Sequence, residues 1–472
     1  MEKSNGLPKG WETTELSTVC KVSSGIGFPK IHQGEKEGKY PFYKVGDISK
    51  TVQSGKIWLQ NADNYVSEKV CEELNGNPFP KGTIAFAKIG EALKLNRRSI
   101  SSTDSLFDNN VMGLIPNKNI IKILYLYYYS TVIKLENYSR ATTVPSVRKG
   151  DIESIKIPLP PLNEQKRIVE KIDKLFSASK YLQNLLNKNL LLVTTLKNST
   201  LQDAFTGKLV TQNTNDPPLK IISVIQKKNT GRKPSIDMKM GKAAISVGKS
   251  NVAPPKGWKW VPLLQLAELA TGHTPKRQNP EYWNGKIQWI TGGDAGKHDG
   301  DHIFETKETI TQLGVENSAA VVLPIDTVCF AREASIGYCV LLGKPMATNQ
   351  RFVNFICGEN LMPKYLMYLF LFERNYMFRF KEGSIFGTIY FPAVKAFHIC
   401  LPPLNEQKRI IAKIDLLWSF AKKIESEIIL KINTLNSFEK SVLKYAFEGK
   451  LVPQDPNDEP ASELLKRIKL VN

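Results

Sequence analysis

Hydrophobic residues recur at helical spacing in two long stretches of the chain. After Asn163, isoleucine, leucine, valine and phenylalanine stand mostly three, four or seven positions apart as far as Leu196, and after Asn405 similar spacing continues to Leu443. This spacing predicts two amphipathic helices of roughly 35–40 residues, each about 55 Å long. Helices of this length need a partner helix, so we expect the two to pair, and the folded module between them favours an antiparallel arrangement. The alternative is a helix that lies across its own domain.

Both predicted helices carry start and stop signals. Pro160 and Pro161 precede the first helix and stop any earlier regular structure, and Asn163 is placed to cap its N-terminus. Gly207 and Gly449 follow the helices within the sequence GKLV, where glycine is a natural C-terminal cap residue. The signals therefore give both helices the same beginning and the same end.

The helical stretches belong to an internal repeat. LPPLNEQKRI occupies 159–168 and returns unchanged 242 positions later, and PKGW opens at Pro8 and again at Pro255. AFTGKLV at 204–210 likewise matches AFEGKLV at 446–452. Because the order is kept and the offset changes little, the chain is a duplicated unit of about 200 residues plus a linker.

Weaker matches lie between these blocks. They are YKVGD at 43–47 with ITGGD at 290–294, FAK at Phe86 with FAR at Phe330, and aromatic runs that begin at Ile123 and Tyr365, 242 positions apart. A constant helical part suggests a shared docking task, and a divergent part suggests two different ligands. The alternative is neutral drift after one duplication.

The predicted fold class is α+β, with two mixed modules in pseudo-repeat separated by a pair of long antiparallel coiled-coil helices. The modules alternate short strand-like runs with turns, as in 81–90 and 326–342, and their aromatic runs suggest a helix or two. The predicted boundaries are 1–158 for the first module, 159–206 for the first helix, 207–253 for a linker, 254–400 for the second module, 401–454 for the second helix and 455–472 for a tail.

The charge favours a polyanionic partner. The chain of 472 residues has a formal net charge of +20 and a pI of about 9.4. Residues 207–256 hold ten basic and two acidic residues and read as a flexible linker, so about +12 remains for the folded parts. The alternative is a basic protein without a nucleic-acid partner.

Cysteine spacing and hydropathy indicate a cytoplasmic protein. The six cysteines are scattered without a C-x-x-C pair, which favours reduced thiols over a zinc site or disulfides. No signal peptide is expected at the start, and no membrane segment is expected because the apolar runs are shorter than roughly 20 residues.

Enzyme motifs are weak. DPPL at 216–219 is similar to a methyltransferase motif, but its fourth residue is not aromatic and it lies in the predicted linker. GKS at 248–250 lacks the upstream glycine of a phosphate-binding loop. His298 and His302 stand in a turn-rich stretch without helical character, so a surface loop is favoured over a metal site. No metal site and no catalytic residue are therefore expected.

Two divergent modules, each followed by a proline-led helix with the doubled sequence PPLNEQKRI, resemble the specificity subunit of type I restriction-modification systems. The resemblance spans nearly the whole chain, including the tail at 455–468. It implies that each module is a target recognition domain that reads one half of a split, asymmetric site in double-stranded DNA. It also implies that the paired helices set the unread spacer.

The same resemblance implies partners and the absence of cofactors in this chain. Two methyltransferase subunits would dock on the helices and bring S-adenosylmethionine, and restriction/translocase subunits would bring ATP and Mg²⁺. The doubled block would then serve a doubled partner. The predicted partner-binding residues are Pro160, Pro161, Glu164, Gln165, Ile168, Ile172, Pro402, Pro403, Glu406, Gln407, Ile410 and Ile414.

Candidate DNA contacts follow from side-chain chemistry. Lysine and arginine suit phosphates, arginine suits guanine, and asparagine and glutamine suit adenine. The candidates are Lys88, Lys94, Arg97, Arg98, Asn109, Asn110, Arg140 and Arg148 in the first module, and Lys276, Arg277, Arg332, Asn349, Gln350, Arg351 and Tyr390 in the second. For any one of them, a solvated surface side chain is the alternative.

Matched positions in the repeat strengthen some candidates. Lys88 corresponds to Arg332, and Asn109–Asn110 is matched with Asn349–Gln350. The stretch 139–147 is matched with 383–394, and loops at this place are expected to face DNA. The rival hypotheses are a coiled-coil scaffold with two protein-binding heads and a fused methyltransferase or nuclease. Only a DNA reader should lose DNA binding steeply as salt rises.

Overall fold

The computed structural model describes residues 6–139, 144–213, 215–219, 221, 245–247, 253–381 and 387–469. The chain forms two compact units, each with its own core. The first unit combines residues 1–187 with 430–472, and the second unit holds residues 188–429. Each unit is described by itself below.

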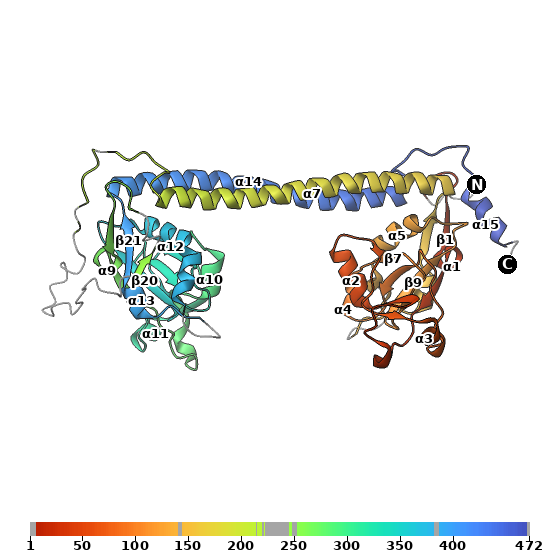
Figure 1. Cartoon of the computed structure of the whole chain (residues 1–472), viewed down its shortest axis with the longest axis horizontal. Coiled ribbons are helices and arrows are strands. Elements are labelled where there is room, and N and C mark those ends of the chain that lie inside the picture. Colours follow the sequence, from red (N-terminus) through yellow and green to blue (C-terminus); the bar gives the residue numbers. More distant parts are fainter. Residues whose placement is uncertain are drawn as a thin grey trace. The chain divides into compact units, whose positions relative to one another are not determined.

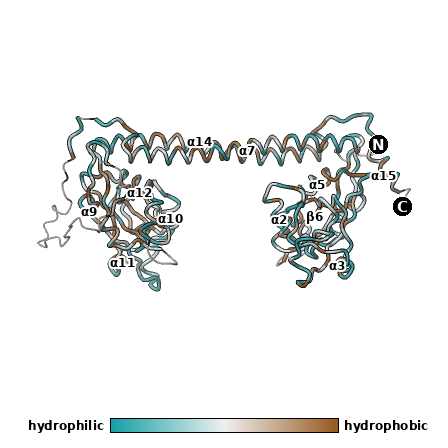
Figure 2. The backbone as a smooth tube through the Cα atoms, in the orientation of Figure 1, coloured by the Kyte–Doolittle hydropathy of each residue, from teal (hydrophilic) through white to brown (hydrophobic). Residues whose placement is uncertain are grey.

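Two long helices each contribute a part to both units. They are α7 (Leu162–Phe205) and α14 (Leu404–Phe447), each of 44 residues (Figure 1). Polar and hydrophobic residues alternate along both, as Figure 2 shows by colour. The amphipathic pattern therefore predicted both helices, with ends within a few residues.

Side-chain hydrogen bonds join the two long helices within each unit. In the first unit, Ser179 Oγ donates to Glu439 Oε1 at 2.7 Å and Gln183 Nε2 donates to Asn436 Oδ1 at 3.2 Å. In the second unit, Lys197 Nζ donates to Glu425 Oε2 at 2.7 Å. The residue number on α14 falls as the number on α7 rises, so the predicted antiparallel pairing is confirmed.

Both predicted ends of the helices agree with the backbone, with one correction. The amides of Gln165 and Gln407 donate to the carbonyls of Pro161 and Pro403, so a proline, and not Asn163, precedes each helix. Pro161 suits this place because the last residue before a helix needs only an accepting carbonyl. At the other end, Gly207 and Gly449 adopt φ of +72° and +70°, as expected of glycine caps.

The first unit is built on three sheets. The largest has the strand order β2-β9-β6-β7-β4, the second has β5-β3-β8, and a third pairs β1 with β10. All neighbours are antiparallel except the pairs β4–β7 and β3–β8. The strands are β1 (Glu12–Glu15), β2 (Cys20–Ser24), β3 (Tyr40–Tyr43), β4 (Trp58–Leu59), β5 (Tyr65–Val66), β6 (Ile84–Ala87), β7 (Ser99–Ser101), β8 (Leu106–Phe107), β9 (Val111–Pro116) and β10 (Lys156–Leu159).

Short helices connect and cover these strands. The longest of them, α5, places Tyr125 and Leu126 in a core that also contains Ile168 and Ile172 of α7. The helices are α1 (Leu16–Val19), η1 (Lys30–His32), α2 (Val45–Gln53), α3 (Glu68–Glu73), α4 (Glu91–Lys94), α5 (Ile123–Val132), η2 (Leu135–Tyr138), α6 (Lys149–Glu153) and α15 (Ala461–Lys469).

The second unit repeats this order. Its sheets are β13-β20-β17-β18-β15, β16-β14-β19 and β11-β21-β12. The strands are β11 (Ile245–Val247), β12 (Lys259–Pro262), β13 (Ala267–Thr271), β14 (Trp283–Ile290), β15 (His302–Ile303), β16 (Glu308–Ile310), β17 (Val328–Ala331), β18 (Cys339–Leu342), β19 (Ala347–Thr348), β20 (Phe352–Cys357) and β21 (Phe397–Leu401). The helices are α9 (Leu263–Leu266), η3 (Pro280–Tyr282), α10 (Gly292–Lys297), α11 (Gln312–Glu316), α12 (Pro363–Met377), η4 (Phe378–Phe380) and α13 (Phe391–Lys395).

The α+β class and the duplication are therefore confirmed, and one detail of the predicted linker differs. Ile245–Val247 pairs in parallel with Phe397–Ile399 as strand β11, inside the range that composition assigned to the linker. A second detail concerns the aromatic helices. The Tyr128 hydroxyl donates to Asp173, and the Tyr368 hydroxyl donates to Asp415. Residues of α5 and α12 therefore correspond at an offset of 240 positions, and not at the predicted 242.

The hydropathy of the helices bears on whether any of them could cross a membrane. No helix in the described part of the chain is both long and apolar enough to cross a membrane. The long helices instead carry their hydrophobic residues in stripes among polar ones.

The caps at the ends of the long helices provide a stability test. In Gly449→Ala, the new Cβ would lie 2.1 Å from Pro8 Cγ and the residue would have to keep φ near +70°. We expect the variant to lose at least about 1–2 kcal/mol of stability. Gly150→Ala is the matched control, because Gly150 lies in α6 with no atom within 4 Å of the added carbon. Urea unfolding followed by circular dichroism would measure both, and equal midpoints would contradict the capping role.

Candidate nucleic-acid interface

The doubled sequence PPLNEQKRI holds each long helix against the module that precedes it. Gln165 Nε2 donates to the carbonyls of Ile120 and Pro160 at 3.0 Å, and its Oε1 accepts from the amide of Lys122 at 2.8 Å. The side chain is fully buried. A buried amide that meets three backbone groups fixes the start of the helix in one position.

The same arrangement recurs in the second unit. Gln407 Nε2 donates to the carbonyls of Asn360 and Pro402 at 2.9 and 3.1 Å, and its Oε1 accepts from the amide of Met362 at 2.9 Å. The repeated glutamine is therefore an anchor within the chain. This explains in structural terms why the block occurs twice: each module needs its own anchor.

A tryptophan and a glutamate accompany each anchor. Trp258 Nε1 donates to Glu406 Oε1 at 3.0 Å in the second unit. Trp11 and Glu164 hold the equivalent places in the first unit, where both side chains are buried. Burial raises the pKa of both carboxyl groups, while the neighbouring tryptophan acts in the opposite direction.

An arginine in each block binds the segment that follows the other long helix. Arg167 Nη2 lies 2.7 Å from Asp458 Oδ2 in the first unit, and Arg409 Nη2 lies 2.6 Å from Asp216 Oδ2 in the second. The Arg409 guanidinium lowers the pKa of Asp216. Asp216 thus has an ion partner in a stretch that the sequence assigned to a flexible linker.

The predicted partner-binding residues are all buried in their own unit. They are Pro160, Pro161, Glu164, Gln165, Ile168, Ile172, Pro402, Pro403, Glu406, Gln407, Ile410 and Ile414. Direct contact of these side chains with a partner is therefore at odds with the structure, because they already fill the joint between helix and module. Docking of a partner on the exposed faces of the same helices stays a prediction.

The two units also correspond at the end of the central strand of their largest sheet, which is β6 in the first unit and β17 in the second. In the second unit, the Arg332 amide donates to the Arg351 carbonyl at 2.9 Å, and the Ile389 amide donates to the Arg332 carbonyl at 2.9 Å. Three segments that are distant in sequence therefore meet after β17.

The first unit has the same meeting point after β6. The Lys88 amide donates to the Asn110 carbonyl at 2.9 Å, and the Val147 amide donates to the Lys88 carbonyl at 3.0 Å. We call these segments the reading loops. In the first unit they are 88–89, 109–110 and 146–148, and in the second unit they are 332–333, 350–351 and 388–390. They bring together predicted residues from all three segments.

These hydrogen bonds correct the predicted alignment by one residue. Asn110 corresponds to Arg351, so Asn109 corresponds to Gln350, and Asn349 corresponds to Asp108. Asp108 Oδ1 accepts from the Asn110 amide at 2.8 Å, and Asn349 Oδ1 accepts from the Arg351 amide at 3.0 Å. Asn349 is only 8% exposed and shapes the turn, so it is poorly placed to contact DNA.

The last segment aligns Arg148 with Tyr390, and Val147 with Ile389 and not with Val394. Arg148 and Tyr390 directly precede α6 and α13, and both side chains are exposed. Arg140 lies outside the described residues. The polar side chains exposed on the reading loops are thus Asn109, Asn110 and Arg148 in one unit and Gln350, Arg351 and Tyr390 in the other.

Arg332 differs from its counterpart Lys88 in its contacts. Its Nη2 donates to the Gln350 carbonyl at 3.0 Å, its Nη1 lies 3.5 Å from the Ile389 carbonyl oxygen, and its guanidinium lies 4.7 Å from the centre of the Phe391 ring. The side chain therefore ties two reading loops together. A DNA contact by Arg332 itself stays a prediction.

Three predicted residues lie on α4 or just after it. Arg98 is 3% exposed, and its guanidinium donates to Asn96 Oδ1 and to a backbone carbonyl while lying over the Phe86 ring. Burial lowers the pKa of Arg98 to about 9. The buried Arg98 side chain is therefore poorly placed to contact DNA. Lys94 pairs with Glu91 at 2.7 Å, and Arg97 is half-buried.

Lys276 and Arg277 lie on a loop next to the reading loops of the second unit. The Thr274 hydroxyl on that loop donates to Gln350 Oε1. Arg277 donates to both oxygens of Glu308, at 2.6 and 3.0 Å, and its guanidinium lies over the Trp283 ring. That pairing neutralises Arg277, whereas the Lys276 side chain stays exposed.

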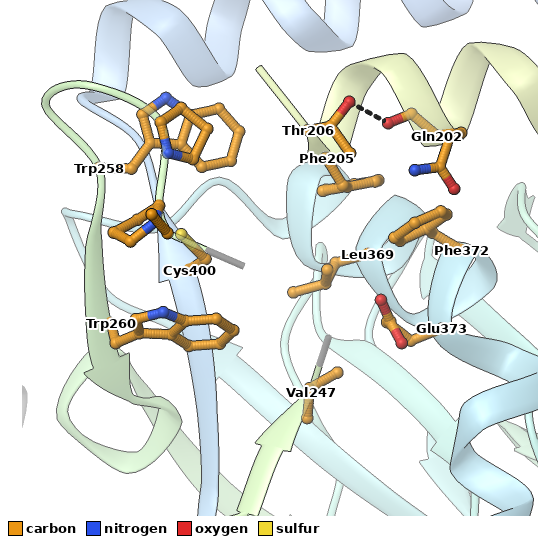
Figure 3. A pocket seen from close by; sticks show the side chains of 13 residues that line it. Gln202, Phe205, Thr206, Val247, Trp258, Trp260, Leu369, Phe372, Glu373 and Cys400 are labelled. Atoms are coloured by element: carbon orange, nitrogen blue, oxygen red, sulfur yellow. Dashed lines mark hydrogen bonds between the residues drawn. The ribbon is translucent and has the colours of Figure 1, made fainter. Parts of the chain in front are cut away.

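The pocket drawn in Figure 3 lies at the end of α7 in the second unit and has a volume of about 160 Å³. Trp258, Trp260 and Phe372 line it, and the Thr206 hydroxyl donates to the Gln202 carbonyl at its rim. Burial raises the pKa of the lining thiol of Cys400 to about 12, so the thiol is protonated at neutral pH. Within the described parts of the chain, no three His, Cys, Asp or Glu side chains are grouped to hold a metal.

A family comparison agrees with the fold and the repeated site. The model of the type I restriction modification DNA specificity domain matches residues 8–190 and 255–434. The chain therefore belongs to the family of type I restriction-modification specificity proteins, with the domain present twice. The resemblance drawn from the sequence is confirmed.

Relatives and solved structures give the extent of the likeness. The chain is 23% identical to the type I restriction enzyme EcoDI specificity subunit of Escherichia coli, over 98% of this chain and 95% of that protein. It is 31% identical to the MjaIX specificity subunit of Methanocaldococcus jannaschii over 184 residues, which span 38% of this chain and 42% of that protein.

Among solved structures, a chain from a study of complex assembly and conformational transition of the type I R-M system is similar with a TM-score of 0.68 at 18% identity. That likeness covers 94% of this chain and 99% of the other. The HsdS subunit from Thermoanaerobacter tengcongensis is similar with a TM-score of 0.53 at 18% identity, over 94% of this chain and 98% of that one. These likenesses support the fold.

The anchor provides a test that is independent of DNA. In Gln407→Leu, the Asn360 and Pro402 carbonyls and the Met362 amide would lose this partner, at a cost of about 1–3 kcal/mol for each group that stays buried without another. We expect faster hydrogen exchange at the Met362 amide and a lower unfolding midpoint. Gln183→Leu is the control, since that glutamine makes one exposed hydrogen bond between the helices. If both variants behaved alike, the anchor role would be wrong.

Proposed function

We propose that this chain is the sequence-reading subunit of a type I restriction-modification complex. Each unit would read one half of a split site in double-stranded DNA through its reading loops. The observation that carries this proposal is that both units present exposed polar side chains at equivalent backbone positions, but with different chemistry. Equivalent loops with different side chains suit two different half-sites.

The paired helices would set the number of unread base pairs between the half-sites. In support, α7 and α14 are each one continuous helix of 44 residues with a part in each unit. The buried glutamine anchors join each helix firmly to a module. A rigid helix and a rigid joint are what a constant spacing requires.

Two copies of a methyltransferase subunit would dock on the exposed apolar side chains of the long helices. Four such side chains occupy equivalent positions, 242 residues apart: Leu182 and Ile424, and Leu196 and Phe438, with exposed fractions of 40–45%. Each unit then carries one residue from α7 and one from α14. The hydrogen bonds Ser179–Glu439 and Gln183–Asn436 hold Leu182 and Phe438 at the same level of the helix pair.

The chemistry of the complex would lie in its other subunits. We propose that this chain holds no cofactor and catalyses no step, and that the methyltransferase brings S-adenosylmethionine while the restriction subunit brings ATP and Mg²⁺. The half-buried, protonated Cys400 in the apolar pocket of the second unit is in keeping with a structural role. Purified chain that methylated or cut DNA alone would contradict this part of the proposal.

Tyr390 tests the reading loops. Tyr390→Ala should weaken binding to the cognate duplex at least about tenfold, because burial of a large apolar side chain in an interface contributes about 1.5–3 kcal/mol. Tyr376→Ala is the control, since Tyr376 on α12 is similarly exposed, at 44% against 50%. Fluorescence anisotropy at several salt concentrations would measure both. Equal affinities of the two variants would remove the loop at 388–390 from the interface.

Leu182 and Phe438 test the docking surface. The double variant Leu182→Asp with Phe438→Asp should release one of two methyltransferase copies, because it places charge in one of two equivalent patches. Leu191→Asp is the control, since Leu191 is 66% exposed but corresponds to Asn433 in the other helix. Native mass spectrometry of the purified complex would count the copies. Two retained copies in the double variant would refute docking at these positions.

A further inference from the structure

Arg351 has the best-defined setting among the exposed side chains of the reading loops. Its backbone is held on both sides: the amide donates to Asn349 Oδ1 at 3.0 Å and the carbonyl accepts from the Arg332 amide at 2.9 Å. Its Nε lies 3.9 Å from Glu333 Oε1, and half of the side chain stays exposed. No described residue accepts a hydrogen bond from Nη1 or Nη2. The guanidinium thus has a carboxylate near its Nε, while its two Nη groups are open.

The first unit has the same backbone with different side chains. Asn110 corresponds to Arg351, and its amide and carbonyl are held in the same way by Asp108 and Lys88. Ile89 corresponds to Glu333, since Ile89 bridges to Ser146 as Glu333 bridges to Thr388. The two positions change together: arginine is accompanied by glutamate, and asparagine by isoleucine. A carboxylate is present only where there is a guanidinium to orient.

We propose that Arg351, oriented by Glu333, selects guanine at one position of the half-site read by the second unit, and that Asn110 selects adenine at the matching position of the first half-site. This inference rests on the proposed function and adds the bases to it. A guanidinium with two free Nη groups matches the O6 and N7 acceptors of guanine. A carboxamide matches the N6 donor and N7 acceptor of adenine.

The fixed backbone makes the side chain the deciding difference. Because hydrogen bonds hold the amide and the carbonyl of this residue in both units, the Cα atoms occupy the same place relative to the end of the central strand. An exchange of side chains should therefore exchange the base preference, without rebuilding the loop. Glu333 acts through Arg351 and is a positioning residue.

The test is a selection of bound duplexes from a random library by the complete complex, purified through a tag on this chain and read by sequencing. The wild type should enrich a split site with guanine at one position of one half. Arg351→Asn combined with Glu333→Ile should move that single position toward adenine and leave the other positions unchanged. Arg351→Ala should lower the preference for guanine by about 5- to 150-fold.

Three further variants test base reading separately from charge. Arg351→Lys keeps the positive charge but loses the fork, so the guanine preference should fall while the salt dependence of binding stays unchanged. Glu333→Gln should weaken the preference at the same position alone, which a general loss of structure would not do. Asn110→Arg should create a guanine preference in the other half-site.

Other outcomes overturn the inference in distinct ways. Arg351 contacts a phosphate if Arg351→Ala weakens all duplexes equally without a change in base preference. It serves only its ion pair with Glu333 if neither affinity nor preference changes. If the wild-type complex enriches no split site, the proposed function itself fails.

Discussion

A buried glutamine hydrogen-bonded to three backbone groups is the contact on which the rest of the structure depends. Gln165 and Gln407 join the first turn of each long helix to the segment that precedes the aromatic helix of the same unit. An amide at zero exposure tolerates no shift, because any displacement strands donors and acceptors away from water. Helix and module therefore move as one body.

The anchor is the same in the two units, whereas the reading loops differ between them. The tryptophan, glutamate, glutamine and arginine of the joint are the same residue types in both units, whereas the reading loops carry asparagines and arginine in one unit and glutamine, arginine and tyrosine in the other. Strands β6 and β17 present those loops from the same backbone framework. A change of side chain in a reading loop can therefore alter recognition without weakening the joint.

The sequence predicted the elements that depend on periodicity and repetition. The long helices follow from the spacing of Ile168, Ile172 and their successors, and the two units follow from the offset repeats. The sequence did not predict which residues of the two modules correspond, because loops of unequal length change the offset between the two copies. This is why Asn110 was matched with Gln350 instead of Arg351.

The remaining differences between the sequence-based predictions and the structure arise from tertiary contacts. Charge alone favoured Arg98 as a DNA contact, yet Phe86 and backbone carbonyls enclose it. The doubled block suggested partner contacts, but its predicted side chains are buried in the joint between helix and module. One signal was available in the sequence: Asp216 and Asp458 stand at the same repeat position, as partners of Arg409 and Arg167 would have to.

The ion pair between Arg167 and Asp458 has a consequence for synthesis of the chain on the ribosome. The two residues are 291 positions apart, so at about 5–20 residues per second the arginine waits roughly 15–60 s for its partner. In the second unit the order is reversed, because Asp216 is translated before Arg409. The ion pair of the first unit can thus form only after the whole second unit has been translated.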